Sequence, residues 1–446
     1  MTTTLMPEAA QRLVRRYYVY GGIYTLAASI IWGVNTLFLL NAGLSIAEVF
    51  IANSAWALGT MLFEIPTGVV ADTVGRRASF LLSLVVLAIT TLAYVGLAEI
   101  GAGVVAFSVV SALIGLGFTF YSGAMEAWLV DGLRFHGYEG ELDQVFSRGQ
   151  IVSGVGMLIG TIGGGVLGQV NLSIPFLVRS GLLIILFVLA FVGMHDLGFE
   201  PKRVKLAQLP SEAGKIARAG IRFGWQQPSL RLMMLASAVQ MGVFAWAWYA
   251  WQPYFLELLG RDLVWVAGVV AALLAISMMI GNAIVQIITR WCGRRTTLFL
   301  WSGGVFSFAL IGVGVVDSFF PALALLFLGG VGLGVQMPVR QAFVHQIVPS
   351  EQRATVVSFD SMVSGGGSVV GQTSLGALSD QRGFSVGYIV GGLATLAAIP
   401  ILALVRRQRD DADFFEGSRP DFACAAPGVP AISQLDGGVT VDTGET

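Results

Sequence analysis

Four carboxylates stand inside or just beyond long apolar stretches of this sequence: Glu64, Glu126, Asp131 and Asp360. A carboxylate held away from water binds a proton more readily, so it can load a proton on one side of a membrane and release it on the other. We therefore expect proton coupling at these positions. Glu126 and Asp131 are five residues apart and do not share a helix face, so they are not expected to form a carboxylate dyad.

Arg340 also lies within an apolar stretch, Val335-Gln-Met-Pro-Val-Arg340. An arginine in such a place needs a carboxylate, a carbonyl or water as its partner, which makes it a functional candidate. Its predicted role is to switch between a carboxylate and a substrate. The alternative is that its long side chain snorkels to the membrane surface.

Four further residues on these stretches are candidates for lining a substrate cavity: Asn35, Tyr121, Trp248 and Gln336. For two of them, Asn35 and Trp248, a purely structural role is the alternative. An asparagine inside an apolar helix often forms a hydrogen bond to a neighbouring helix. Trp248 belongs to an aromatic stripe that fits a membrane-interface belt as well as a cavity wall for flat or cationic substrates.

The elements that position these residues are predicted to be membrane-spanning helices. The chain has 446 residues, of which 55% are hydrophobic and 12% charged, a balance outside the range of soluble proteins. A span needs about 20 apolar residues. Twelve stretches qualify: 17–40, 48–70, 78–98, 103–129, 147–169, 174–195, 230–256, 263–289, 297–317, 320–347, 354–379 and 385–405. The predicted fold class is an all-α integral membrane protein.

Positive charges predict the orientation, because Lys and Arg accumulate on the cytoplasmic side of membrane proteins. With the N-terminus inside, 23 of the 26 Lys and Arg residues fall on that side, and Arg179, Arg261 and Arg382 are left on the outer side. Both termini are then cytoplasmic. Arginine greatly outnumbers lysine, which hints at a GC-rich bacterial genome and hence at a bacterial inner membrane.

Several classes of function do not fit the sequence. A net charge of −1 argues against a nucleic-acid partner. The two cysteines, Cys292 and Cys424, both fall on the cytoplasmic side, so no disulfide is expected. The sequence contains no nucleotide-binding loop, metal-ligand cluster or nucleophile with its base. We therefore expect no cofactor, no metal and no catalysis, and ion coupling becomes the expected energy source.

One loop is dense with small and charged residues: Gly68-Val-Val-Ala-Asp72-Thr-Val-Gly75-Arg76-Arg77. A degraded copy follows about 218 residues later, Gln286-Ile-Ile-Thr-Arg290-Trp-Cys-Gly293-Arg294-Arg295, with Arg290 in the place of Asp72. The first copy resembles the signature between helices 2 and 3 of the major facilitator superfamily of transporters. The resemblance implies that Gly68, Asp72, Gly75, Arg76 and Arg77 form a cytoplasmic latch between the two halves in the outward-open state. The alternative is that the arginines only set the topology.

Two further stretches recur in the same order, residues 115–123 at an offset of 217 and residues 147–165 at an offset of 211. Three ordered repeats predict two pseudo-symmetric six-helix halves. The predicted divisions are a first half (1–195), a cytoplasmic linker (196–229), a second half (230–405) and a cytoplasmic tail without structure (406–446).

The glycine-rich stretch Gly156–Gly165 is similar to the signature of drug:proton antiporters in that superfamily, but Thr161 stands in place of its proline. Thr119 likewise stands where the antiporters often have an arginine. Small-residue helix packing is the alternative reading. The resemblance implies proton-driven multidrug efflux of small apolar or cationic compounds. Uptake of a metabolite by proton symport stays open, and a membrane-embedded enzyme fits less well. The expected partners are a small-molecule substrate, protons and the lipid bilayer, with the chain as a monomer.

Overall fold

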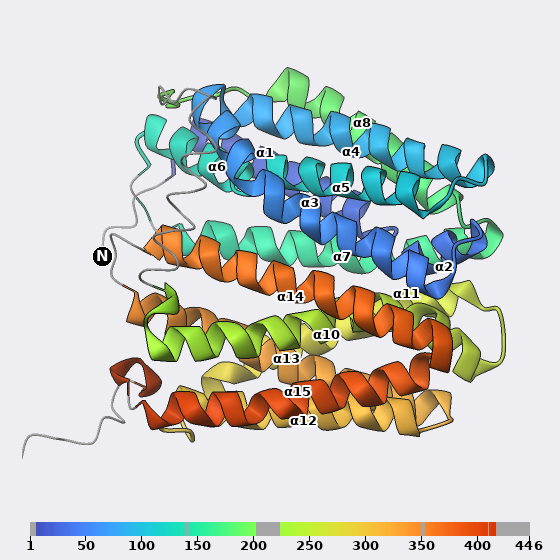
Figure 1. Cartoon of the computed structure of the whole chain (residues 1–446). Helices are drawn as coiled ribbons and strands as arrows, with labels where there is room; N and C mark the ends of the chain where they lie inside the picture. The colour runs from blue at the N-terminus through green and yellow to red at the C-terminus, as the bar shows by residue number, and fades with distance from the viewer. Residues whose placement is uncertain are drawn as a thin grey trace, which may run out of the picture.

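The computed structural model describes residues 6–138, 140, 142–201, 224–348, 353–408 and 410–415. Every regular element in this part of the chain is a helix, as the sequence predicts (Figure 1). Ten helical stretches within it are long and apolar enough to cross a membrane. The protein is therefore a multi-pass membrane protein.

The first half contains eight helices in the described residues: α1 (Glu8–Ser29), α2 (Asn35–Asn41), α3 (Ile46–Thr73), α4 (Arg76–Glu99), α5 (Val104–Tyr121), α6 (Ala124–Phe135), α7 (Asp143–Val170) and α8 (Ile174–Gly193). The second half contains α10 (Pro228–Leu259), α11 (Val264–Ile288), α12 (Arg295–Val315), α13 (Phe319–Ile347), α14 (Arg353–Arg382) and α15 (Phe384–Arg407). A short 3-10 helix, η4 (Asp411–Asp413), follows α15.

Two of the predicted spans are broken. The stretch 17–40 comprises α1, a turn and α2, and α1 already begins at Glu8 because charged residues near a membrane surface extend a helix as readily as apolar ones. The stretch 103–129 is divided between α5 and α6 at Gly123, whose φ of +76° is a left-handed conformation that favours glycine. Hydropathy alone does not reveal either break.

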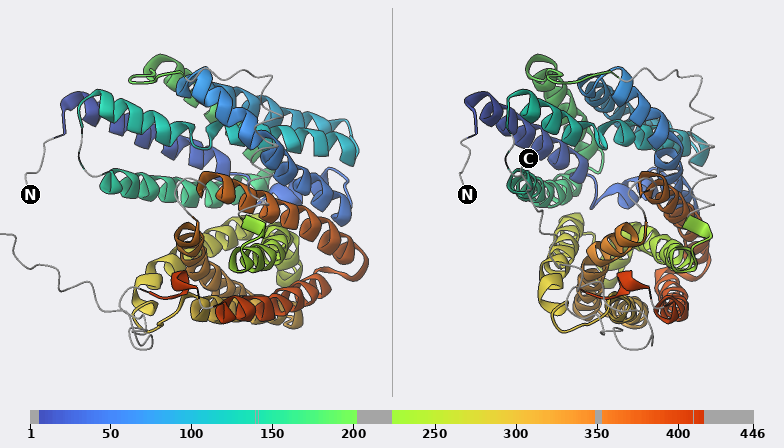
Figure 2. Two further views of the ribbon diagram at one scale, coloured as in Figure 1. Left: turned by 60° about the vertical axis from the view of Figure 1, so that its left-hand side comes forward. Right: turned by 90° about the vertical axis from the view of Figure 1, so that its left-hand side faces the viewer.

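The helices form two bundles, one above the other in Figures 1 and 2. In the first, α1 packs on α7, and α5 packs on α3 and α4; in the second, α10 packs on α14 and α12 on α13 and α15. Aromatic side chains fill both interiors, with Trp128 and Phe80 buried in the first and Trp246 and Tyr388 in the second. The close packing of such large side chains stabilises each bundle through van der Waals contacts.

The two bundles meet along two helix pairs, α3 with α14 and α7 with α11. We call the end of the molecule that carries α2 and the α10–α11 loop the α2 end, and the opposite end, where α1 begins and α15 finishes, the α1 end. In Figure 1, α3 and α14 lie close at the α2 end and diverge toward the α1 end.

Residues 410–415 fall in the stretch expected to be a tail without structure. They instead fold back as η4 and an isolated bridge between Arg294 and Phe414. Most of the expected linker and tail, residues 202–223 and 416–446, lies outside the described residues.

Candidate functional site

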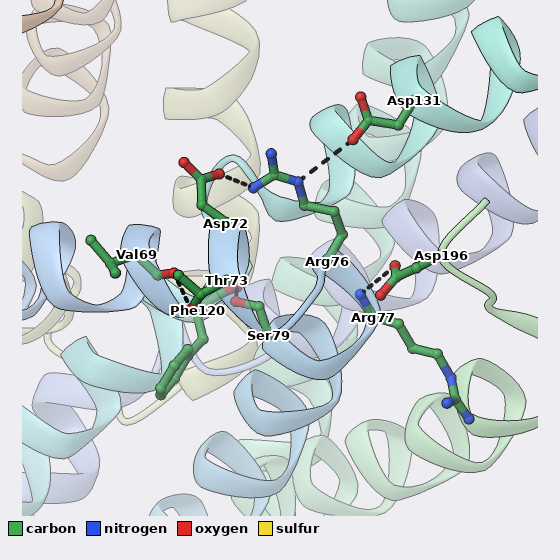
Figure 3. Close-up of polar contacts among 9 residues, drawn as sticks. All are labelled: Val69, Asp72, Thr73, Arg76, Arg77, Ser79, Phe120, Asp131 and Asp196. Carbon is green, nitrogen blue, oxygen red and sulfur yellow. Dashed lines mark hydrogen bonds and ion pairs between the residues drawn. The ribbon is translucent and has the colours of Figure 1, made fainter. Parts of the chain in front are cut away.

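The segment Gly68–Arg77 joins the last turns of α3 to the first turn of α4. Gly75 has a φ of +130°, a conformation that favours glycine, and leads directly into α4. Asp72 and Arg76 form an ion pair with 2.5 Å between Oδ1 and Nη1 (Figure 3). Nε of Arg76 lies 3.7 Å from a carboxylate oxygen of Asp131 on α6. The loop therefore connects α3, α4 and α6 through alternating charges.

Arg77 anchors the same loop to the segment that follows α8. Its backbone N–H donates to Oδ1 of Asp196 at 2.9 Å (Figure 3). Its guanidinium donates to the Phe191 carbonyl, in the last turn of α8, at 2.8 Å. A carboxylate at the first turn of a helix is favoured by the unpaired N–H groups there. Burial nevertheless raises the pKa of Asp196, and the hydrogen bond and charge of Arg77 only partly oppose this rise.

These contacts change the interpretation of two predicted residues. Asp131, a candidate proton carrier, lies beside Arg76 in the loop network. Gly68 is exposed, with open space where a side chain would stand. The contacts described here for the loop join elements of the first half. A latch between the halves in a second conformation stays a prediction.

The second half has a corresponding arrangement, which the sequence analysis did not predict. Asp413 accepts hydrogen bonds from the backbone N–H and the hydroxyl of Thr296, at 2.7 and 2.9 Å, at the start of α12. The ring of Phe414 lies beside the guanidinium of Arg294, 4.7 Å from its centroid. Asp413 stands 217 positions after Asp196. Each half therefore holds the start of one helix with an aspartate from beyond a later helix: α4 by Asp196 after α8, and α12 by Asp413 after α15.

The halves are joined at the α2 end by hydrogen bonds around Gln252, a fully buried residue of α10. Its Oε1 accepts from the Thr36 N–H at 2.8 Å, and its Nε2 donates to the Trp32 carbonyl at 2.9 Å. The Thr36 hydroxyl donates to the Tyr249 carbonyl at 3.0 Å. Two of these bonds give partners to backbone groups at the break between α1 and α2, the Thr36 N–H and the Trp32 carbonyl. All three connect this break to the second half.

Glycines let α7 and α11 approach closely near the same end. A Cβ at Gly268 would lie 2.5 Å from the Thr161 carbonyl oxygen, and a Cβ at Gly33 would lie 3.2 Å from the Gly268 Cα. Such close backbone contact excludes any larger residue at Gly268. The α2 end is thereby closed between the halves.

A cavity of about 280 Å³ lies between the halves on the other side of this closure. It is lined from α3, α10 and α14, and its residues include Trp56, Thr60, Glu64, Met241 and Ser364. Glu64 is exposed into this space, and among the described residues its carboxylate has no hydrogen bond or ion pair. The structure thus brings Glu64, one of the predicted proton carriers, to the interface of the halves, in a cavity that it shares with the ring of Trp56 and the thioether of Met241.

Glu126 lies elsewhere, in the first turn of α6 just after the break at Gly123. It lines a small cavity of about 80 Å³ inside the first half, together with Tyr17, Tyr121 and Ser153. Tyr121 stacks on Tyr24 with 3.6 Å between ring centroids. Glu126 and Tyr121 therefore share a site that is separate from the cavity of Glu64.

Arg340 and Asp360 form a bidentate pair between α13 and α14. Nη2 of Arg340 lies 2.5 and 2.6 Å from the two carboxylate oxygens, and Asp360 is 7% exposed. The guanidinium therefore pairs with a carboxylate in this conformation. One turn earlier on α13, Gln336 donates to Oε1 of Gln240 at 2.7 Å, which places it between helices of the second half.

The remaining two cavity candidates take part in packing. Asn35 donates to Oδ1 of Asn53 at 3.0 Å, the helix-to-helix hydrogen bond that the sequence offers as its alternative role. Trp248 packs against Phe244 within the second half and against Trp32 of the first half, each with 5.8 Å between ring centroids.

Asp196, Gln252 and Asp413 are structurally important residues that sequence reasoning missed. Asp196 and Asp413 each follow the end of a predicted span, at corresponding positions of the repeat, and that correspondence is the signal that could have identified them. Gln252 is a polar residue inside an apolar stretch, as Gln336 is, and the same criterion would have included it.

Comparisons with known proteins decide the family. The sequence model described as the Major Facilitator Superfamily matches residues 18–291 and again residues 266–426. The chain belongs to the Major Facilitator Superfamily. It is 21% identical over 409 residues to the uncharacterized MFS-type transporter YxaM of Bacillus subtilis (strain 168), covering 89% of this chain and 96% of the relative.

Solved structures of transporters share the fold. The nucleoside transporter NupG superposes with a TM-score of 0.72 at 12% identity, covering 89% of this chain and 99% of NupG. A mutant of the peptide transporter POT gives a TM-score of 0.71 at 13% identity, covering 90% and 95% of the two chains. The family membership identifies the protein as a secondary transporter. The different substrates of its structural neighbours show that the fold does not set the substrate.

Proposed function

We propose that this transporter exports small apolar or cationic compounds in exchange for protons, across a bacterial inner membrane. In this proposal it has twelve spans in two six-helix halves, with both termini in the cytoplasm. The order of the helices supports twelve spans, with α1–α2 and α5–α6 each counted as one broken span. The distribution of Lys and Arg supports the orientation.

With this orientation, the α2 end faces outward and the structure is closed on the outside. The cavity that contains Glu64 then faces the cytoplasm, where an exporter takes up its cargo. Transport would proceed by rocking of one half against the other, with the bonds of Gln252 broken as the outer side opens.

The observation that carries the proposal is the position of Glu64 in the cavity between α3 and α14. An ionised Glu64 attracts a cationic group, and Trp56 and Met241 offer apolar contact to the rest of the compound. Protonation from the outer side removes that attraction and releases the compound. Substrate and proton thus compete for one carboxylate, which is sufficient for exchange.

The direct test is the movement of fluorescent lipophilic cations in everted membrane vesicles, with and without a protonophore. We expect uptake into everted vesicles that stops when the protonophore collapses the proton gradient. Vesicles without the transporter give the background. Movement in the opposite direction would favour proton symport, the mode of uptake left open by Thr119 and Thr161, and movement that ignores the protonophore would refute coupling.

A further inference from the structure

An arginine lies on the buried face of α8, away from the cavity of Glu64. Arg179 is only 6% exposed and shares its helix face with Phe176, Ser180 and Leu183, all of them buried. It lies in the second turn of α8, about 7 Å along the helix from its first residue at 1.5 Å per residue. The side chain is therefore enclosed by helices instead of reaching the membrane surface, although the distribution of charges assigns it to the outer side.

Arg179 has no carboxylate partner. Among the described residues its guanidinium forms no ion pair or hydrogen bond, and its Nε is fully enclosed. Arg340 shows the contrast, since it meets both oxygens of Asp360. A buried, uncompensated charge is strongly destabilising, and ionisable residues kept within spanning helices commonly serve a ligand.

The surroundings of Arg179 are tyrosines from both halves. Three tyrosines lie close enough to the guanidinium to influence its charge: Tyr24 on α1, Tyr94 on α4 and Tyr249 on α10. Tyr94 shares a hydrogen bond with Ser111. Because Tyr249 belongs to the second half, the Arg179 guanidinium lies near the surface where the halves meet.

We propose that Arg179 binds an acidic group of transported compounds, so that the substrates extend to carboxylates attached to an apolar body. A guanidinium matches a carboxylate in planar, bidentate geometry, and the pair is neutral overall. The tyrosines add hydroxyl donors and aromatic contact area. A monoanion fits this enclosed place better than a phosphate dianion, which is far costlier to remove from water.

The position of Tyr249 suggests how the site would be opened. Its carbonyl accepts the Thr36 hydroxyl in the closure at the α2 end. When that closure breaks, Tyr249 moves with the second half and Arg179 stays with the first. A carboxylate held between them then loses part of its site as the outer side opens. The inference rests on the proposed function only for the statement that the bound compound is transported.

The test compares matched pairs of acid and amide on the purified full-length protein in detergent. The probes are indole-3-acetate with indole-3-acetamide, and benzoate with benzamide. At concentrations well above the dissociation constant, we expect the acids to raise the melting temperature by about 2–4 °C and the amides to have little effect. Arg179→Gln removes the response to the acids. Arg261→Gln, which changes an exposed arginine between α10 and α11, keeps it.

Three results would overturn the proposal: equal stabilisation by acid and amide, no stabilisation by either acid, or an unchanged response of Arg179→Gln. If Arg179→Gln does not fold, Tyr249→Phe decides, because it keeps the ring and removes one hydroxyl; we expect binding of the acids to weaken several-fold. Unchanged binding in Tyr249→Phe then counts against the site.

Two further variants distinguish an anion site from a structural arginine and from proton coupling. Arg179→Met removes an unpaired buried charge, so we expect a higher melting temperature without ligand; a lower one would indicate a purely structural arginine. Glu64→Gln retains the response to the acids, because the binding measurement needs no proton gradient. Failure of proton coupling and failure of the anion site therefore give different results.

Discussion

Asp413 holds the first turn of α12 through two hydrogen bonds from a single residue, Thr296. The first half uses Asp196 and the backbone of Arg77 in the same way. In the second copy of the signature loop, Arg290 replaces the aspartate within the loop. The capping carboxylate is present in both copies, since it comes from residues beyond α8 in the first half and beyond α15 in the second.

Replacing Asp413 should destabilise the second half. Asp413→Ala leaves the buried N–H and hydroxyl of Thr296 without their acceptor, which costs about 1–3 kcal/mol. We expect the melting temperature in detergent to fall by several degrees, whereas Asp317→Asn, at an exposed carboxylate, changes it little. A deletion of residues 410–446 should be less stable than a deletion of 416–446. Equal stability of the two deletions would contradict the role of residues 410–415.

Glu64→Gln should abolish proton-coupled transport and leave the protein folded. Glutamine keeps the shape of the side chain but cannot exchange a proton at neutral pH. Flux in everted vesicles measures coupling, and elution as a single sharp peak from size-exclusion chromatography checks folding. Glu126→Gln provides the comparison, since its cavity lies inside the first half. If transport is unchanged in both variants, neither carboxylate takes part in the mechanism.

The pair of Arg340 and Asp360 should behave as a unit. Arg340→Met leaves the buried carboxylate of Asp360 without its partner and should cost about 3–5 kcal/mol, whereas Asp360→Leu leaves a partly exposed guanidinium and should cost less. The double variant should recover most of the stability lost in Arg340→Met. A double-mutant cycle of melting temperatures measures the coupling. Additive losses would show that the pair is not energetically linked. Transport by the double variant then reports whether the charges are needed for more than stability.

Asp196 should give the folded protein a pH dependence. Because burial raises its pKa above the unfolded value of about 4, its contribution to stability is full below about pH 4 and is lost as pH rises through the raised value. Asp196→Asn does not ionise and lacks this loss. We therefore expect the difference in melting temperature, variant minus wild type, to become more positive as the pH rises through that range. A difference in melting temperature that stays constant across this pH range would contradict the assignment of the pH dependence to Asp196.

The membrane fold is predictable from the sequence because apolar length and ordered repeats are local properties. The signature loop around Asp72 and its copy carry the family resemblance in residue types and spacing alone. The break at Gly123 is harder to predict, since its flanking residues are ordinary helix formers and the left-handed conformation depends on packing. Ser79 shows part of that packing, because its hydroxyl donates to the Phe120 carbonyl near the break at 2.7 Å (Figure 3).

The side-chain partners are not predictable in the same way. Arg340 is identifiable as an arginine that needs a partner, but several carboxylates could serve, and only the folded arrangement, which brings the side chain of Arg340 on α13 to α14, selects Asp360. Arg179 is a sharper case. Its position near the outer end of a span suggests a topological charge, and only burial without a partner points to a ligand.

The contact at Gly268 offers a practical tool. This conformation has no room for a methyl group there, because the Thr161 carbonyl and the Gly165 backbone fill the space. Gly268→Ala would therefore act as a wedge that penalises the closed α2 end while leaving the rest of α11 helical. A preparation enriched in the opposite state would help in selecting conformation-specific antibody fragments and in crystallising the transporter with its α2 end open.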